Sequence, residues 1–458
     1  MAKSDINPFN PPREASAPPA PSASSARHVV MIGLCAAATI AYVQRNSIGV
    51  AEGVIRDEFG LSKVEMGRVI GAFFLTYAIA QLPTGWLGHV LGSRRGLTLF
   101  STVWSLCTAA MALTTSGASL FMVRLGMGAA QAGVFPCCAN TMAGWIPSTR
   151  RGTASGALGA FMSVGGVIGA ALTGVLVVTI GWRWTFASYA LPGLLWAVWF
   201  GYWFRDRPGQ HRSVNQAELD LITGSPSASP QDADLPDARR PAGKANDAPT
   251  REPTPWGQML SSRSMLWIGG QQFFRAAGYI FYASWFPDYL KETYKVSTTE
   301  SGFLTSLPIM AVAVGSLLGG RVCDAVLQAT GSRRMARQGV AFASMILCAL
   351  LILAAYFVQD VLPAVLLISL GSFCAAFAGP CAYTITIDLG GRHVTMVFSF
   401  MNMCGNIAAV LLPVLLPYVP NQFVLFGFGG VYVAAAVCWV SFDAEKEIFK
   451  SREAKPAA

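Results

Sequence analysis

Apolar stretches of about 20 residues recur along the whole chain, separated mostly by short polar turns. Each stretch is long enough to cross a bilayer as an α-helix, which satisfies its backbone hydrogen bonds internally. The sequence therefore predicts an all-α membrane protein of twelve transmembrane helices. The first six lie near 28–50, 65–89, 96–115, 118–143, 152–179 and 184–204, and the second six near 262–290, 298–326, 336–358, 362–388, 394–417 and 421–442.

A polar, charged and proline-rich segment separates the two sets of six helices. Such a composition cannot bury a core, so we expect a loose linker. The amino-terminal segment is rich in Pro, Ala and Ser and lacks the order of a cleaved signal peptide. The predicted organisation is a disordered cytoplasmic tail (1–27), a six-helix bundle (28–204), a cytoplasmic linker (205–258), a second six-helix bundle (259–442) and a cytoplasmic tail (443–458).

Composition agrees with a lipid environment, because 53% of the residues are hydrophobic and only 12% are charged. A soluble protein of this size carries roughly twice that charged fraction. The formal net charge of +9 does not predict nucleic-acid binding, since the charges lie between the apolar stretches and form no continuous basic face.

The distribution of Lys and Arg predicts that both termini are cytoplasmic. With that orientation the outer loops hold few basic residues, and most of these stand beside acids. The inner segments hold Arg27, Arg94, Arg95, Arg150, Arg151, Arg205, Arg207, Arg212, Arg333, Arg334, Arg337 and Arg392, against Arg56, Lys63, Arg68, Arg183, Lys291 and Lys295 outside.

The sequence offers no pattern for a metal, a cofactor or a catalytic centre. None of the ten cysteines has CxxC spacing, and we expect them to be small apolar side chains within helices. HExxH, GxSxG and P-loop motifs are absent from the sequence, so we do not expect an enzyme.

The two halves repeat a short pattern. GWLGHVLGSRRG (85–96) follows helix two, and GGRVCDAVLQATGSRR (319–334) follows helix eight. Both contain glycines, a short turn and paired arginines at the matching place, as expected for a transporter built from repeats.

Five stretches together resemble the major facilitator superfamily, and within it the anion:cation symporter family of bacterial sugar-acid and vesicular organic-anion carriers. The resemblance spans nearly the whole chain except the tail and the linker. The stretches are YVQRNSIGVA (42–51), EFGLSKVEMGRVIGAFFLTYAIAQLPTGWLG (58–88), RLGMGAAQAGVFP (124–136), GWRWTFASYALPGLLWAVWFGYWFRDRP (181–208) and GPCAYTITIDLGGRHVTMVFSFMNMCGN (379–406).

The chain departs from that family at four positions. Gln44 and Gln131 stand where the family usually has acids, just before the helix-one arginine and seven residues after the helix-four arginine. His89 replaces an aspartate, and Arg150 replaces a glutamate. Because glutamine cannot titrate, we expect the usual proton route to be missing.

Three arginines lie within predicted membrane helices: Arg45, Arg124 and Arg275. A charge at this depth is costly unless it faces water or a partner, and helices one to six offer Arg45 and Arg124 no nearby acid. An unpaired guanidinium is a natural carboxylate receptor. The resemblance gives Arg45 that role and makes Arg275 similar to a helix-seven arginine of the vesicular branch. Alternatively, Arg124 binds helix-end carbonyls and Arg275 extends toward the interface.

Polar side chains near these arginines complete the predicted site in a central cavity, where they can bind the hydroxyl groups of a sugar acid. The alternative is that they hold helices together. The predicted substrate-binding residues are Arg45, Tyr42, Gln44, Tyr77, Gln131, Arg275, Tyr282, Asn402 and Asn406.

The cytoplasmic loops should form an inner gate through ion pairs and helix-end contacts. Since His89 and Arg150 replace acids, we expect the outward-facing state to be weakened. The predicted gate residues are His89, Arg94, Arg95, Arg150, Arg151, Asp324, Arg333 and Arg334.

The sequence therefore predicts a carrier of small organic anions, expected to be sugar acids such as hexuronates or aldonates, working by alternating access. We expect a monomer in the inner membrane of a bacterium, with the lipid bilayer and the anion as partners and no cofactor. Coupling to protons through other groups, and a sensor of the same fold that no longer transports, remain as alternatives.

Overall fold

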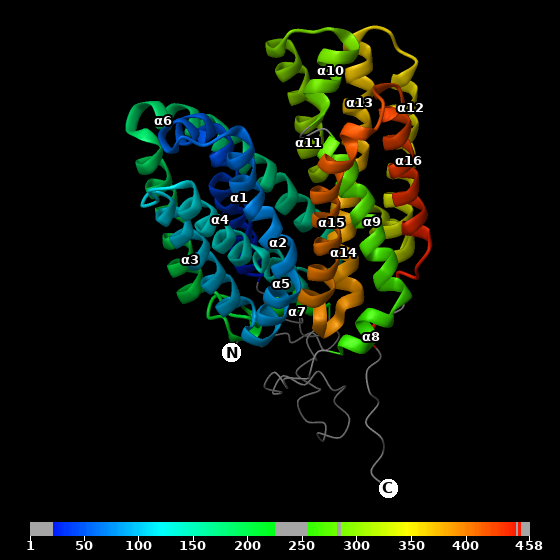
Figure 1. Ribbon diagram of the computed structural model, residues 1–458. Coiled ribbons are helices and arrows are strands. Elements are labelled where there is room, and N and C mark those ends of the chain that lie inside the picture. Colours follow the sequence, from blue (N-terminus) through cyan, green and yellow to red (C-terminus); the bar gives the residue numbers. More distant parts are fainter. Residues whose placement is uncertain (1–21, 225–254, 282–284, 446–447, 450–458) are drawn as a thin grey trace, which may run out of the picture.

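The structure is a computed structural model that describes residues 22–224, 255–281, 285–445 and 448–449. All regular secondary structure in these ranges is helical. The helices form two bundles, one from each half of the chain, which lie side by side (Figure 1). The prediction of an all-α membrane fold with two six-helix bundles is confirmed.

The amino-terminal bundle follows the predicted spans closely. Its fourth crossing is divided by Gly133 into two helices, and its fifth and sixth crossings run on as one helical stretch. The elements are α1 (Ala26–Phe59), α2 (Lys63–Leu91), α3 (Ser93–Met111), α4 (Gly117–Ala132), α5 (Val134–Trp145), η1 (Ser148–Arg150) and α6 (Arg151–Trp203).

The carboxyl-terminal bundle is more interrupted, with breaks in its first and fourth crossings. Between the bundles lie η2 (Pro208–Gln210), α7 (Gln216–Thr223) and α8 (Trp256–Ser261). The bundle consists of α9 (Arg263–Ile280), α10 (Phe286–Tyr294), α11 (Thr298–Thr330), η6 (Arg334–Gly339), α12 (Val340–Tyr356), α13 (Val361–Ala376), α14 (Ala378–Gly390), η7 (Gly391–His393), α15 (Val394–Leu415), η8 (Leu416–Tyr418) and α16 (Asn421–Val440).

Eight helical stretches of the described residues are individually long and apolar enough to cross a membrane. Two of them, of 56 residues (148–203) and 52 residues (361–412), exceed the roughly 20 residues of one crossing. The first reverses at Gly181, whose φ of 80° favours glycine, and the second turns at η7. Each is therefore two crossings, and α3 together with α9–α10 completes the twelve.

The internal repeat seen in the sequence recurs in the backbone. Gly92 ends α2 with a φ of 79°, and Gly331 ends α11 with a φ of 65°. Both conformations are easy for glycine and strained for other residues. The two matching motifs thus end the second helix of each half in a similar way.

The linker is not loose throughout. Its helix α7 carries Glu218, which is fully buried and accepts hydrogen bonds from the backbone N–H groups of Ala26 (3.3 Å) and Arg27 (3.0 Å). These N–H groups belong to the first turn of α1, where a carboxylate satisfies unpaired donors. Composition could not show this contact, so the prediction is wrong for α7. The tails 1–21 and 450–458 and linker residues 225–254 lie outside the described residues.

The two halves are in close contact along several pairs of helices. Helix α2 packs against α15, and α6 packs against α11 and α14. An added Cβ at Gly152 would lie 2.7 Å from the carbonyl oxygen of Gly320, and one at Gly159 would lie 2.6 Å from Ser316 Oγ. Small residues thus let α6 and α11 approach backbone to backbone.

The bundles converge at the end of the molecule where α7 and α8 lie, here called the linker end, and diverge toward α10 at the opposite end (Figure 1). Large apolar side chains such as Leu113, Val178, Trp184 and Phe357 are exposed on their flanks. Exposed apolar surface of this kind is covered by lipid in a membrane.

Candidate functional site

Arg45 lies in the middle of α1 and is half-buried. Its guanidinium carbon is 5.2 Å from the ring centre of Tyr42, 4.8 Å from Phe73, 4.8 Å from Phe74 and 5.0 Å from Tyr77. Each such cation–π contact contributes about 0.5–2 kcal/mol, depending on desolvation. We call these four rings the aromatic cage. It stabilises the cation without neutralising its charge.

Arg124 lies beneath the same cage on α4 and is only 1% exposed. Its guanidinium carbon is 4.8 Å from the Phe73 ring, and its Nη1 donates to the backbone oxygen of Arg45 at 3.4 Å. The Phe73 ring therefore contacts both arginines. Arg124 therefore binds a carbonyl in the middle of α1, not one at a helix end as the alternative expected, and it supports the segment of α1 that carries Arg45.

Arg275 on α9 comes from the other half and is also half-buried. Its Nε and Nη2 donate to Gln272 Oε1 at 3.3 and 2.8 Å, and Nη1 lies near Gly379 of α14. Tyr383 and Tyr42 interact with it electrostatically. Arg275 therefore contacts its own helix and α14 and lies within electrostatic reach of Tyr42 in the other half.

Among the described residues, no Asp or Glu side chain forms an ion pair within 4.0 Å of Arg45, Arg124 or Arg275. Unpaired cations inside a membrane protein are costly and mark functional positions. The three guanidinium groups give this part of the molecule a positive charge that no ion pair compensates among the described residues.

Polar groups join the halves beside the aromatic cage. Asn402 Nδ2 on α15 donates to the hydroxyl of Tyr77 on α2 at 3.2 Å, and Asn406 Nδ2 donates to the backbone oxygen of Asn402 at 2.7 Å. Tyr77 and Asn402 thus lie at the predicted site, while the amide of Asn406 is used within its own helix. The predicted residue Tyr282 lies outside the described residues.

Gln44 does not lie beside Arg45 in space. It is fully buried, donates through Nε2 to the carbonyl oxygen of Tyr189, and accepts from Thr108 Oγ1 at 3.2 Å. Consecutive helix residues point about 100° apart, so Arg45 and Gln44 cannot face the same space. The prediction that Gln44 contacts substrate is therefore wrong for this conformation.

Gln131 is also fully buried, on α4. Its Nε2 donates to the carbonyl oxygen of Ala41 at 3.0 Å, and its Oε1 has no hydrogen-bond partner. Its partner Ala41 is the residue before Tyr42 on α1, but the Gln131 side chain itself is not exposed. In this conformation Gln131 holds α4 to α1 and is not available to substrate, so its predicted contact is also wrong here.

At the linker end, Asp324 of α11 joins the two halves. It accepts hydrogen bonds from the backbone N–H groups of Gly152 at 2.8 Å and Thr153 at 2.6 Å, in the first turn of α6. A carboxylate at a helix amino terminus satisfies unpaired N–H groups and is stabilised by the helix dipole. The predicted gate contact between Asp324 and a helix end is present.

Asp388 of α14 makes the second contact between the halves. Its Oδ1 lies 3.1 Å from Arg151 Nη1 of α6, and its Oδ2 lies 3.1 Å from Arg337 Nε of η6. Arg337 also lies 3.7 Å from Asp324. One ion-pair network therefore connects both acids, and Arg151 ties it to the amino-terminal half.

His89 takes part in the same closure. Its ring centre lies 4.9 Å from that of His393 in η7, so α2 meets the other half through two imidazoles. His393, Arg337 and Asp388 were not predicted from the sequence. An acid inside a predicted membrane helix was a usable signal for Asp388, and no sequence signal pointed to the other two.

The remaining predicted gate arginines do not cross between the halves. Arg94 binds within its own bundle, with its N–H donating to Asp206 Oδ1 at 2.8 Å and Nε to the Gly201 oxygen at 2.7 Å. Burial raises the pKa of Asp206, and the backbone N–H groups of Arg94 and Ser93 partly offset this. Arg95, Arg150, Arg333 and Arg334 are exposed, and Arg333 lines a hollow of about 260 Å³ beside Arg337.

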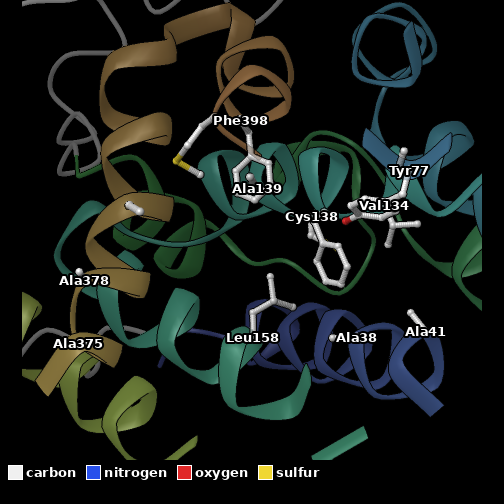
Figure 2. Close-up of a cluster of buried hydrophobic side chains, with 14 of the residues drawn as sticks. Ala38, Ala41, Tyr77, Val134, Cys138, Ala139, Leu158, Ala375, Ala378 and Phe398 are labelled. Atoms are coloured by element: carbon white, nitrogen blue, oxygen red, sulfur yellow. The ribbon is translucent and has the colours of Figure 1, made fainter. Parts of the chain in front are cut away.

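A buried apolar cluster joins the two halves. Figure 2 shows Ala38 and Leu158 of the amino-terminal half with Ala378 and Phe398 of the other half, in one buried cluster that also holds Tyr77. Close-packed apolar contacts exclude water. The cluster therefore excludes water from this contact between the halves.

Comparison with known sequences points to one family. A sequence model described as "Major Facilitator Superfamily" matches residues 34–334 and 271–457. The "Probable sulfoacetate transporter" of Cupriavidus necator is 29% identical over 86% of this chain and 87% of its own length. The "Probable galactarate/D-glucarate transporter" of Bacillus subtilis is 29% identical over 92% and 91%. The "D-galactonate transporter" of Escherichia coli is 28% identical over 89% and 92%.

Solved structures share the fold at lower identity. The human organic anion transporter MFSD10 (TETRAN) matches with a TM-score of 0.66 and 16% identity, covering 91% of this chain and 100% of that one. The Escherichia coli fucose:proton symporter matches with a TM-score of 0.66 and 13% identity, covering 91% and 97%. These likenesses support the architecture of two bundles.

Proposed function

Because this chain belongs to the Major Facilitator Superfamily, we propose that it carries small organic anions across a membrane by alternating access. The observation that supports this most is Arg45, a cation at membrane depth that is caged by aromatic rings and has no carboxylate partner among the described residues. Its planar guanidinium is available to bind both oxygens of a substrate carboxylate.

Sugar acids are the substrate class that we propose. Relatives named as galactarate/glucarate, galactonate and hexuronate transporters align over most of this chain. In addition to a carboxylate, such a substrate carries hydroxyl groups. Tyr42, Tyr77 and Asn402 lie close to Arg45 and offer donors and acceptors for them.

The excess of Lys and Arg at the linker end favours a cytoplasmic location for it, in the inner membrane of a bacterium. With that orientation the gate of Asp324 and Asp388 closes the cytoplasmic side, and the conformation faces outward. Asp388, which was not predicted from the sequence, pairs with Arg151. The expectation of a weakened outward-facing state did not include this ion pair. Both halves contribute to the site in one chain, so we propose a functional monomer.

Transport without the family's proton route is supported by the two glutamines. Each donates an amide N–H to a backbone carbonyl, Gln44 to Tyr189 and Gln131 to Ala41. A protonated carboxyl group could donate in the same way, but it could also release its proton, which an amide cannot. Facilitated uptake or anion exchange is therefore our proposal, and coupling through another group is the alternative.

We expect purified protein in proteoliposomes to take up labelled galactonate or galactarate. An inward proton gradient should leave the initial rate of uptake unchanged within about twofold, because a carrier without a titrating group is not driven by protons. Empty liposomes are the control. Strong acceleration by inward protons would refute the coupling proposal alone. Substrate binding without uptake or exchange would instead support a sensor of the same fold.

Replacing Gln131 with glutamate should make uptake pH-dependent. The protonated acid can keep the hydrogen bond to Ala41, which Gln131 now makes at 3.0 Å, whereas the carboxylate would place a negative charge against the carbonyl oxygen. We expect the rate to change up to about tenfold per pH unit across the titration. The measurement is initial uptake as a function of pH. Gln216→Glu is the control, because Gln216 is an exposed residue of α7. A flat profile for Gln131→Glu would show that this position takes no part in coupling.

A further inference from the structure

The surroundings of Arg45 and Arg275 hold more positive charge than one carboxylate can neutralise. Arg45, Arg124 and Arg275 are the three cations, and none of them forms an ion pair among the described residues. Gln44 and Gln131 stay neutral at every pH, so they cannot supply a counter-charge. The ligand itself must therefore bring the missing negative charge.

The two accessible cations belong to different halves and share two tyrosine neighbours. Arg45 and Arg275 are both half-buried, whereas Arg124 is only 1% exposed. Tyr42 contacts Arg45 with its ring at 5.2 Å and also interacts electrostatically with Arg275. Tyr279, which is 41% exposed, interacts electrostatically with both arginines. Both tyrosines thus lie within electrostatic reach of the two guanidinium groups.

The two arginines differ in how many of their N–H donors already have an acceptor. Nε and Nη2 of Arg275 are held by Gln272 Oε1, while Nη1 is directed toward α14 at Gly379, where no side chain fills the space. Among the described residues, the Arg45 side chain makes cation–π contacts but no hydrogen bond or ion pair. Each arginine therefore retains donors for an anionic group of its own.

From this charge balance we infer that the site selects short dianions, with an acidic group at each end, over monoanions of the same length. The inference rests on the proposed transport of organic anions and narrows its substrate class. A dianion pairs with Arg45 through one end and with Arg275 through the other. A monoanion satisfies one arginine and leaves the cation of the opposite half without a counter-charge. Six-carbon aldarates and carboxylates that carry a sulfonate belong to the favoured class.

The test uses a matched pair of ligands, galactarate and galactonate, which have the same number of carbons and differ in the second carboxylate. Binding to the purified full-length protein is measured by calorimetry at neutral pH and constant ionic strength. We expect galactarate to bind at least tenfold more tightly than galactonate. Equal affinity, or tighter binding of galactonate, overturns the inference and leaves the proposed function intact.

The variant Arg275→Gln separates selectivity from general damage. It should weaken galactarate binding at least tenfold, leave galactonate binding within about twofold, and so abolish the preference. The control is Arg321→Gln, an exposed arginine on α11. A loss of equal size for both ligands would assign Arg275 a structural role and overturn the inference. If the wild-type protein neither binds nor takes up either anion, the inference and the proposed function both fail.

Discussion

Arg45→Gln is expected to reduce uptake of the organic anion by about 100-fold or more, because the guanidinium fork can form two charge-assisted hydrogen bonds of about 1.5–3 kcal/mol each with a carboxylate. Glutamine keeps a polar side chain of shorter reach but has no charge. The measurement is the initial rate of uptake into proteoliposomes, together with the dissociation constant of the purified protein.

The thermal stability of the empty protein distinguishes a receptor from a structural arginine. Arg45 has cation–π contacts but no ion pair among the described residues, so its removal ends both the stabilisation by the cage and the cost of an unpaired charge. We expect the Tm of Arg45→Gln to stay within a few degrees of wild type.

Two further variants control this experiment. Arg45→Lys keeps the charge and the cation–π contacts but loses the fork, so it should retain an intermediate affinity. Arg56→Gln removes an arginine near the carboxyl-terminal end of the same helix, where Arg56 pairs with Glu52 at 3.4 Å. It should leave uptake nearly unchanged. Full uptake by Arg45→Gln would remove the main support for anion transport.

The fold could be predicted from the sequence because its main signals are local. Apolar length predicted most crossings within a few residues, although α1 runs on to Phe59, past the predicted end at 50. The repeat motifs drew attention to the segments in which Gly92 and Gly331 end their helices. The linker helix α7 escaped prediction since its stability depends on Glu218 meeting the start of α1, nearly 200 residues earlier in the chain.

The site could be predicted only in part, because a motif gives residue identity but not direction. Arg45 and Gln44 are adjacent in sequence, yet Arg45 lies in the aromatic cage and Gln44 is buried against Tyr189. The cage residues Phe73 and Phe74 were missed since aromatic residues in a membrane helix resemble those facing lipid. A sequence search could have tested their spacing, as Phe73 lies one helical turn before Tyr77 on α2 and stacks on it.

The gate shows how a substitution can be compensated at a distance. His89 and Arg150 stand where the resembled family has acids, and the sequence alone suggested a gate short of partners. In the structure Asp388 pairs with Arg151, and His89 meets His393. The stability of the closed linker end therefore depends on acids of the carboxyl-terminal half.

Asp324→Ala should shift the protein toward a state with the linker end open. The change leaves the N–H groups of Gly152 and Thr153 without the carboxylate that now accepts from them at 2.8 and 2.6 Å. Water can bind these groups only when the halves separate, so the cost falls on the closed state. A buried unsatisfied donor costs about 1–3 kcal/mol, and the population ratio should change by roughly 10- to 100-fold.

Spin labels at Thr149 and Gln328 provide the measurement. These exposed residues lie on opposite sides of the gate, where Gln328 Nε2 donates to the Thr149 oxygen at 3.4 Å. The wild-type distance distribution should be dominated by a short component, and Asp324→Ala should add a longer one. Arg151→Gln removes the 3.1 Å pair with Asp388 and should also add a longer component to the distance distribution.

Asp360→Asn is the matched control for this experiment. Its carboxylate is exposed at the start of α13, away from the linker end, and makes no side-chain cap hydrogen bond. Its distance distribution should match that of wild type. If Asp324→Ala also leaves the distribution unchanged while its Tm falls, Asp324 stabilises the fold of the bundles and does not control their opening. A longer component at unchanged Tm would mean that capping α6 from the other half is what keeps the gate closed, because only the relative position of the two bundles would then have changed.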